Sequence, residues 1–306
     1  MKLVPDAYPN LSRAIDLQLD VFPEHRAYLE KRFVGEDEAG LVFLDQLAVM
    51  VDRVAQGDLK TIFTDYHWLS GIVLEEELFF RRNGRYRLTS FADALEQVYA
   101  NREYMARYMN GLLASQLWWR NHTEVMRYYR DAFLAGNPDG FTHLEVGPGH
   151  GLFLALASAT PACATAEGWD ISQASLANTQ EALNGMGCDP ERIILREVDI
   201  FAAPEASFQS VTFSEVLEHL EEPLEALKAL YKLLAPGGRI FINAPVNSPA
   251  PDHLYLFRTP EEVSDMVAAA GFEIEDTCFA PCTGATLDRA RRLNLTISAA
   301  VIGRKP

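Results

Sequence analysis

The chain is poor in cysteine and contains no long apolar run. Its 306 residues include four cysteines, Cys163, Cys188, Cys278 and Cys282, whose spacing matches neither a disulfide scaffold nor a C-x-x-C zinc pair. No apolar stretch is long enough to span a bilayer, and no charged segment followed by an apolar run opens the chain. We therefore predict a cytoplasmic protein that works in a reducing compartment and has no membrane partner.

Positive charge is also scarce. The sequence has 27 lysines and arginines against 43 aspartates and glutamates, which gives a formal net charge of −16. Clustered basic side chains supply most of the non-specific affinity of proteins for nucleic acids, so this balance argues against DNA and RNA as partners. The one basic cluster runs from Arg81 to Arg87.

Patterns for nucleophilic or metal-assisted catalysis are missing as well. The sequence contains no Cys-His pattern and no Ser-His-Asp pattern with a nucleophile elbow, which disfavours hydrolase chemistry. Aspartates and histidines do not recur at metal-ligand spacing. We expect no metal site.

The second half of the chain alternates short apolar strands with amphipathic segments, which predicts a parallel sheet covered by helices on both faces. We predict a domain boundary in the Gly- and Pro-containing stretch 136–140, with one domain over 1–135 and another over 136–306. The expected strands are Phe141 to Val146, Thr165 to Trp169, Arg192 to Val198, Ser210 to Glu215, Arg239 to Ala244, Phe272 to Phe279 and Leu293 to Ile302.

The first domain is expected to be mainly helical. Helical periodicity covers Leu41 to Val54 and Thr61 to Leu69, and Asn83-Gly84 within 79–88 predicts a hairpin, so the order resembles a winged helix. Such a module grips DNA in some proteins, whereas in others it forms a homodimer and walls a substrate pocket; the acidic composition favours the second role. A helical region from Ser90 to about Ala135 carries aromatic side chains that can roof a pocket or fill a core: Tyr104, Tyr108, Trp118, Trp119, His122, Tyr128 and Tyr129.

The end of the first expected strand carries a carboxylate followed by closely spaced glycines, in the stretch Glu145-Val146-Gly147-Pro148-Gly149-His150-Gly151. Glycines allow positive φ and a close backbone approach to a ligand. Dinucleotide folds instead use G-x-G-x-x-G, and an anion two residues before the first glycine would repel a pyrophosphate. The loop suits a sulfonium or an ammonium group.

At these residues the chain resembles the class I S-adenosylmethionine-dependent methyltransferases, whose first motif reads much like EVGPGHG, and the later motifs follow in order. The resemblance implies a Rossmann-like α/β fold with seven strands, the last inserted antiparallel, and helices on both faces. It implies S-adenosyl-L-methionine as cofactor and S-adenosyl-L-homocysteine as product. The implied cofactor-binding residues are Glu145, Gly147, Pro148, Gly149, His150, Gly151, Asp170, Ile171, Asp199, Ile200, Ser214 and Glu215.

Within this set, Asp170 lies about twenty residues beyond the glycines, where a carboxylate can accept the ribose hydroxyls. Asp199 and Ile200 resemble the family's adenine contact, and Ser214 and Glu215 resemble the turn beneath the transferred methyl group. Purely structural roles stay open: either aspartate can cap a helix or stabilise a turn.

Two histidines are our candidates for the base that deprotonates the methyl acceptor, because each follows a strand at the expected ligand-binding edge. His253 is the first choice and His219 the second. Alternatively, His253 orders its loop, and Glu218 and His219 hold the turn before Pro223.

These residues together predict an enzyme that methylates a small molecule, most simply at oxygen, as in quinone or natural-product metabolism. Methylation at nitrogen or carbon is the nearest alternative. A winged-helix regulator with a cofactor-sensing domain, and a methyltransferase fold used for cyclase or decarboxylase chemistry, are the alternatives from other classes.

Overall fold

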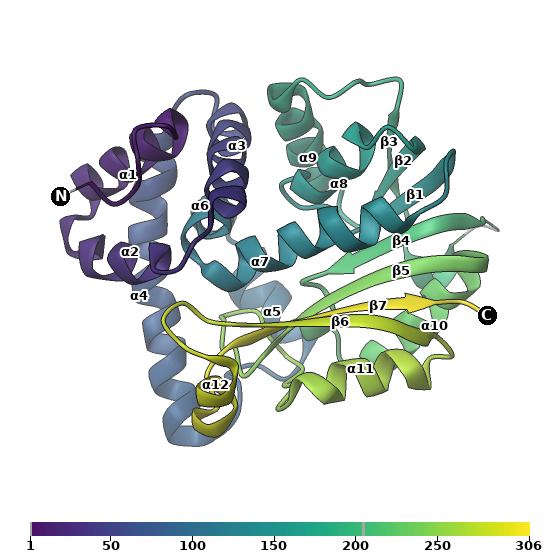
Figure 1. Ribbon diagram of the computed structural model, residues 1–306. Helices are drawn as coiled ribbons and strands as arrows, with labels where there is room; N and C mark the ends of the chain where they lie inside the picture. Colours follow the sequence, from purple (N-terminus) through teal and green to yellow (C-terminus); the bar gives the residue numbers. More distant parts are fainter. Residues whose placement is uncertain (1, 204–205) are drawn as a thin grey trace.

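The N-terminal part of the chain folds into helices. The computed structural model describes residues 2–203 and 206–306. Figure 1 shows α1 to α4 gathered beside a sheet, with α7 running along that sheet. The helices of this part are α1 (Pro9–Val21), α2 (Arg26–Phe33), α3 (Glu38–Val54), α4 (Leu59–Asn83), α5 (Phe91–Ala94), α6 (Arg102–Trp118) and α7 (Arg120–Tyr128).

The C-terminal part is a seven-stranded sheet in the order β3-β2-β1-β4-β5-β7-β6. The first five strands are parallel, and β7 is antiparallel to both of its neighbours, as the sequence predicted. The strands are β1 (Phe141–Val146), β2 (Cys163–Asp170), β3 (Ile193–Glu197), β4 (Phe208–Ser214), β5 (Leu234–Val246), β6 (Glu273–Pro281) and β7 (Ile297–Arg304).

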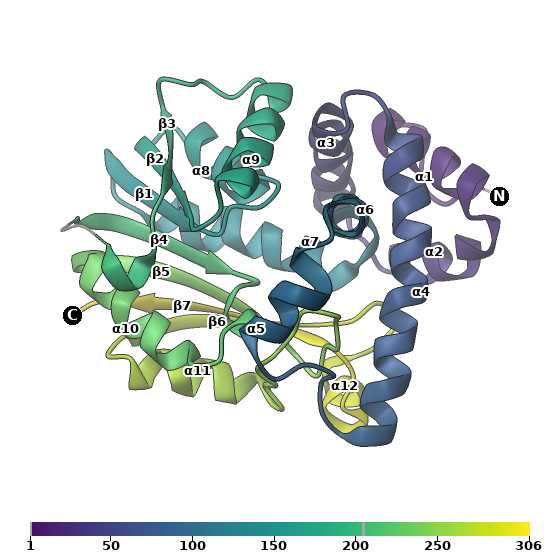
Figure 2. The same ribbon diagram turned by 180° about the vertical axis from the view of Figure 1, so that it is seen from behind.

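Helices cover both faces of the sheet because successive strand side chains point to opposite sides. In β5, Phe241 packs into the cluster of buried residues formed with α7, α8 and α9, whereas Ile240 and Ile242 pack into the cluster formed with α10 and α11. Figure 2 shows these helices from behind. The helices of this part are α8 (Leu152–Ala159), α9 (Gln173–Met186), α10 (Pro223–Leu233), α11 (Pro260–Ala269) and α12 (Leu287–Leu293).

The N-terminal helices share one core with the sheet. Leu44, Phe63 and Trp118 belong to the same cluster of buried residues as Phe141 and Phe241. Helix α7 packs against β6 and β7, although the sequence assigned it to the N-terminal domain. Packing contacts therefore continue across residue 135, where the sequence predicts a domain boundary. The boundary stays a prediction.

The predicted hairpin within 79–88 is wrong. Helix α4 continues through Asn83 and ends at Gly84, which adopts a left-handed conformation (φ +67°) as its C-cap. An Asn-Gly pair supplies positive φ for a tight hairpin turn and for a helix terminus alike, so the dipeptide did not distinguish the two. Arg81 and Arg82 occupy the last turn, where the helix dipole favours positive charge. The module is helical and has no wing within the part of the chain that the structure describes.

The segment 282–292 lies between β6 and β7. It contains most of α12, and the Arg81 guanidinium at the end of α4 donates hydrogen bonds to the carbonyls of Leu293 and Asn294 (2.8 and 3.0 Å). The segment is thus fixed to the N-terminal helices. Among the described residues, no helix combines the length and the apolar character needed to cross a bilayer.

Candidate active site

The glycine loop follows β1 and leads directly into α8. Gly147, Gly149 and Gly151 all have positive φ, at +70°, +49° and +70°. A Cβ atom on Gly147 would lie 2.9 Å from Cγ2 of Val216, so a larger residue fits there only if the β4 turn moves. The Gly147 N–H donates to the Trp169 carbonyl (2.8 Å), which ties the loop to the end of β2.

Glu145 lies at the end of β1 with its carboxylate buried. The residue is 3% exposed, and Oε2 has no hydrogen-bond partner among the described residues. Burial raises the pKa of this carboxyl well above its usual range. A buried carboxylate oxygen without a donor costs free energy, so the position is suited to a ligand that brings a cation or an N–H.

The aspartates predicted to contact the cofactor lie at the carboxyl ends of adjacent strands. Asp170 ends β2 and accepts hydrogen bonds from the Ser172 N–H (2.8 Å) and the Ser175 hydroxyl (2.8 Å). Asp199 follows β3 and accepts from the Phe201 N–H (2.9 Å). Both carboxylates therefore have the turn-stabilising role that the sequence left open, and each oxygen keeps a further lone pair for a ligand.

Their apolar neighbours differ in exposure. Ile171 is 62% exposed, whereas the side chain of Ile200 is half-buried. An exposed isoleucine directly after a strand gains free energy when an apolar ligand covers it.

The turn after β4 is held in a strained conformation. Glu215 has φ +55°, and its N–H donates to the Asn243 carbonyl (2.8 Å). The Asn243 amide donates to Oε1 of Glu215 (2.6 Å) and to the Ser214 hydroxyl (3.1 Å). Burial raises the pKa of Glu215 to about 7. Non-glycine residues at positive φ are costly and gather at functional sites.

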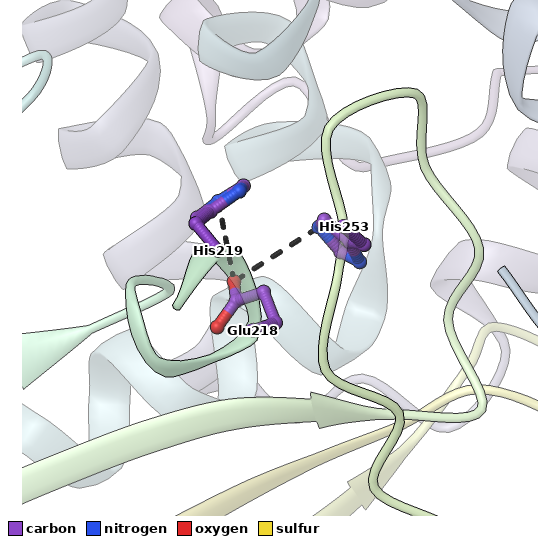
Figure 3. Close-up of side chains that lie close together, drawn as sticks. All are labelled: Glu218, His219 and His253. Carbon is purple, nitrogen blue, oxygen red and sulfur yellow. Dashed lines mark ion pairs between the residues drawn. The ribbon is translucent and has the colours of Figure 1, made fainter. Parts of the chain in front are cut away.

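Glu218, His219 and His253 converge just beyond this turn (Figure 3). Oε1 of Glu218 lies 3.7 Å from Nε2 of His219 and 4.0 Å from Nε2 of His253. The Glu218 side chain is fully buried, and neither of its carboxylate oxygens has a hydrogen-bond partner in residues 2–203 and 206–306. Burial, followed by the neighbouring Glu215 carboxylate, raises the pKa of Glu218 well above its usual range.

Backbone hydrogen bonds bring His253 to Glu218 across 35 positions of sequence. The N–H groups of Leu254 and Tyr255 both donate to the Glu218 carbonyl, at 2.8 and 2.9 Å. The loop after β5 is thereby fixed against the turn after β4. Because these strands are parallel neighbours, both connections lie at the same edge of the sheet.

The hydrogen bonds assign the tautomer of each imidazole. Nδ1 of His219 lies 3.1 Å from the Asp252 carbonyl, and Nδ1 of His253 lies 2.7 Å from the Ser248 carbonyl. A carbonyl only accepts, so both Nδ1 atoms carry hydrogen and both Nε2 atoms present a lone pair toward Glu218. Burial lowers the pKa of His253 to about 4, which keeps its ring neutral.

The N-terminal helices reach this cluster through Asp252. The Tyr108 hydroxyl from α6 donates to Oδ1 of Asp252 (2.9 Å), and the Tyr99 hydroxyl donates to Oδ2 (3.2 Å). Among the aromatic residues considered from sequence for a pocket roof, Tyr108 makes this contact, whereas Trp118 and Tyr129 are fully buried core residues. No local pattern predicts a role for Tyr99 or Asp252, because the contacts join residues far apart in the chain.

His150 lies apart from the other two candidate histidines. Its Nε2 contacts the Met109 carbonyl of α6 at 3.0 Å, and burial lowers its pKa. The imidazole therefore links the glycine loop to the N-terminal helices. Its predicted contact with the cofactor stays a prediction.

A family model described as a methyltransferase domain matches residues 118–277, just over half of the chain. The chain belongs to this methyltransferase family. It is an S-adenosylmethionine-dependent enzyme, as the glycine loop and the order of the later motifs predicted.

Curated relatives of this methyltransferase carry related names. A ubiquinone biosynthesis O-methyltransferase of Neisseria meningitidis is 29% identical over 189 residues, covering 52% of this chain and 78% of the relative. A ubiquinone biosynthesis O-methyltransferase of Paracidovorax citrulli is 34% identical over 155 residues, covering 50% of this chain and 63% of the relative.

Solved structures confirm the fold of the methyltransferase. The pyocyanin biosynthetic protein PhzM superposes with a TM-score of 0.55 at 16% identity, covering 81% of this chain and 72% of its own. The S-adenosylmethionine-dependent methyltransferase SibL superposes with a TM-score of 0.54 at 18% identity, covering 81% and 74%. At these identities the likeness concerns the fold alone.

Proposed function

We propose that this methyltransferase methylates an oxygen atom of a small-molecule acceptor held between the N-terminal helices and the sheet. The observation that carries the proposal is the convergence of Glu218, His219 and His253: two imidazole nitrogens that present lone pairs, beside a buried carboxyl group whose oxygens have no hydrogen-bond partner among the described residues. A site of this kind suits a hydroxyl, which brings the missing proton.

The residues of the neighbouring loop fit the cofactor. S-adenosylmethionine, when bound, supplies a methyl group on a positively charged sulfur. Oε2 of Glu145, which has no partner among the described residues, would accept a hydrogen bond from the ammonium group of the cofactor's amino-acid part. The glycines with positive φ would let the backbone approach the cofactor closely. Around it we assign Pro148 and His150 to the loop contact, Asp170 and Ile171 to the ribose, Asp199 and Ile200 to the adenine, and Ser214 and Glu215 to the side of the methyl group.

His253 is our candidate base, with His219 as the second. Nε2 of His253 takes the hydroxyl proton while the acceptor oxygen forms its bond to the methyl carbon. With S-adenosylmethionine bound, its sulfonium would supply the methyl group and would leave as the neutral thioether, so the atoms and charges balance. Most of the rate enhancement comes from holding the groups in line in a site screened from water. Tyr99 and Tyr108 contribute by fixing Asp252 beside His219.

The choice of oxygen rests on the site and on the relatives. The relatives from Neisseria meningitidis and Paracidovorax citrulli are both named O-methyltransferases. A neutral imidazole supports removal of a hydroxyl proton, whereas an amine acceptor loses its proton to water after methylation and needs no base. The cluster is therefore better explained by an oxygen acceptor.

A product assay tests the proposal. The purified enzyme is incubated with S-adenosylmethionine and panels of small phenols, amines and activated carbon acceptors, and S-adenosylhomocysteine is quantified together with the methylated product. We expect S-adenosylhomocysteine to form only with hydroxyl compounds. Turnover confined to amines would refute the oxygen assignment, and conversion of an acceptor without S-adenosylhomocysteine would indicate chemistry other than methyl transfer.

In this proposal the N-terminal helices form one side of the site that binds the methyl acceptor. Tyr99 and Tyr108 lie there, and the family match begins only at residue 118. A homodimer through these helices also stays our prediction. Analytical ultracentrifugation tests it, and a monomer at all concentrations would exclude it.

A further inference from the structure

We propose that Glu218, His219 and His253 bind a divalent metal ion, with zinc as the preferred metal, at the acceptor side of the site. The three side chains offer two imidazole nitrogens and a carboxylate oxygen that all lie within 4.8 Å of one another. The inference rests on the proposed function, because it gives this metal the acceptor oxygen as its next ligand.

The first argument is that the buried Glu218 carboxyl group has no positively charged or hydrogen-bond-donating neighbour among the described residues. The Glu218 side chain is fully buried, and both oxygens lack hydrogen-bond partners within the part of the chain that the structure describes. The two imidazole nitrogens beside it present lone pairs rather than N–H groups. The ionised Glu218 carboxylate and the two lone pairs repel one another in a buried site. A cation placed between them turns that repulsion into attraction.

The second argument is geometric. Zinc–nitrogen and zinc–oxygen bonds are about 2.0–2.2 Å long, so two ligands of one tetrahedral ion lie about 3.4 Å apart. The Glu218–His219 and Glu218–His253 separations are 3.7 and 4.0 Å. These two pairs therefore need to close by only a few tenths of an ångström. The two imidazole nitrogens lie within 4.8 Å of each other and need to close by at most about 1.4 Å.

The third argument comes from the groups behind the ligands. Metal-bound histidines usually donate their other ring N–H to a carbonyl or carboxylate, which fixes the tautomer. Here Nδ1 of His253 donates to the Ser248 carbonyl and Nδ1 of His219 donates to the Asp252 carbonyl. The Asp252 carboxylate lies 3.6 Å from the same His219 nitrogen and adds a negative charge near the ion.

The ligand set favours one group of metals. Two imidazoles and one carboxylate suit zinc and its neighbours in the transition series, whereas magnesium and calcium prefer oxygen ligands alone. Catalytic zinc sites typically use three protein ligands and leave a position for water or substrate. The His219 side chain is 23% exposed, so the cluster is open on that side.

A metal ion changes how the acceptor loses its proton. With zinc between the three side chains, Nε2 of His253 is a ligand and no longer takes the proton. The acceptor hydroxyl instead releases its proton to water when its oxygen binds zinc, because the metal stabilises the oxyanion. Methyl transfer then proceeds from that oxyanion as before. The expectation from sequence, which found no metal-ligand spacing, is revised by this proposal.

Metal titration tests the inference. The full chain is stripped with a chelator and titrated with zinc by calorimetry, as wild type and as the variants Glu218→Gln, His253→Gln and His67→Gln. His67 is an exposed histidine outside the cluster and controls for binding at surface imidazoles. We expect one zinc per chain in wild type and in His67→Gln, and an affinity about 100-fold lower in the two cluster variants. Failure of the wild type to bind, or equal affinity in all four proteins, would overturn the inference.

Two further measurements separate this inference from the proposed function and from misfolding. In the first, cobalt(II) is added to the stripped wild type, and strong visible absorption is expected if the imidazoles bind the ion in a four-coordinate site. The weak spectrum of hydrated cobalt would refute the site. This measurement needs no variant, so it holds even if neither cluster variant folds. Calorimetry with S-adenosylhomocysteine reports on the cofactor site alone. An enzyme that transfers methyl groups equally well after stripping refutes the metal but not the methyltransferase proposal.

Discussion

The cofactor edge and the acceptor cluster of this enzyme differ in how far their residues lie apart in the sequence. At the cofactor edge, comprising 145–151 with Asp170 and Asp199, the two aspartates are held by contacts within a few residues, as in the bond from the Ser172 N–H to Asp170. The acceptor cluster, comprising Glu218, His219, Asp252 and His253, is joined by contacts between distant segments. Changes at the first should alter cofactor affinity, whereas changes at the second should alter turnover.

The largest effect is expected for His253→Gln. The substitution removes Nε2, which either takes the acceptor proton or binds a metal, so kcat should fall by about 1,000-fold while affinity for S-adenosylhomocysteine is unchanged. Steady-state kinetics and calorimetry measure the two quantities. His67→Gln is the matched control, and turnover equal to that of the control at saturating acceptor would remove His253 from the reaction.

The second largest effect is expected for Gly147→Ala, which should weaken cofactor binding. The left-handed backbone costs about 1–2 kcal/mol of stability for any residue with a Cβ. The new Cβ also meets Cγ2 of Val216 at 2.9 Å, so we expect about 100-fold weaker binding of S-adenosylhomocysteine.

The control for this glycine is Gly187→Ala. Gly187 has φ +76° at the end of α9, and its Cβ position is open, so it carries the backbone penalty without the contact. Chemical denaturation should show the backbone penalty in both variants and an additional destabilisation in Gly147→Ala from the contact with Val216. Equal cofactor affinity in both would show that the shape of the loop at Gly147 does not matter for binding.

Asp170→Ala tests the ribose assignment with a smaller expected effect. The change removes a carboxylate that accepts two ligand hydrogen bonds in our account, and affinity for S-adenosylhomocysteine should drop about 10-fold to 30-fold. Asp189→Ala serves as control, since Asp189 stabilises a similar turn through the Glu191 N–H (2.9 Å) away from the site. An affinity that matches the control would leave Asp170 with its turn role alone.

Tyr108→Phe should have the smallest effect. It removes the 2.9 Å hydrogen bond to Asp252 but keeps the ring, so we expect kcat to fall about fivefold and the free energy of unfolding to fall by about 1–3 kcal/mol. Tyr104→Phe, on the neighbouring stacked ring, should change neither. If both variants behave alike in turnover, the N-terminal helices do not act on the cluster through Asp252.

The comparison also explains what the sequence could predict. The strands and the glycine loop follow from local periodicity and spacing, the antiparallel last strand follows from the family resemblance, and the structure confirms all three. The prediction of a hairpin at Asn83-Gly84 was wrong because the same dipeptide supplies positive φ in a hairpin turn and at a helix C-terminus. The Tyr99 and Asp252 contacts and the convergence of Glu218 with His253 depend on how loops from different strands pack. No local pattern encodes that packing.

Calorimetric titration of the wild-type chain with S-adenosylhomocysteine tests the central claim most directly, since every role assigned above depends on cofactor binding at the end of β1. We predict binding of one molecule per chain that Gly147→Ala weakens strongly and His253→Gln leaves intact. Absence of binding heat together with an unchanged melting temperature in the presence of the ligand would contradict the account.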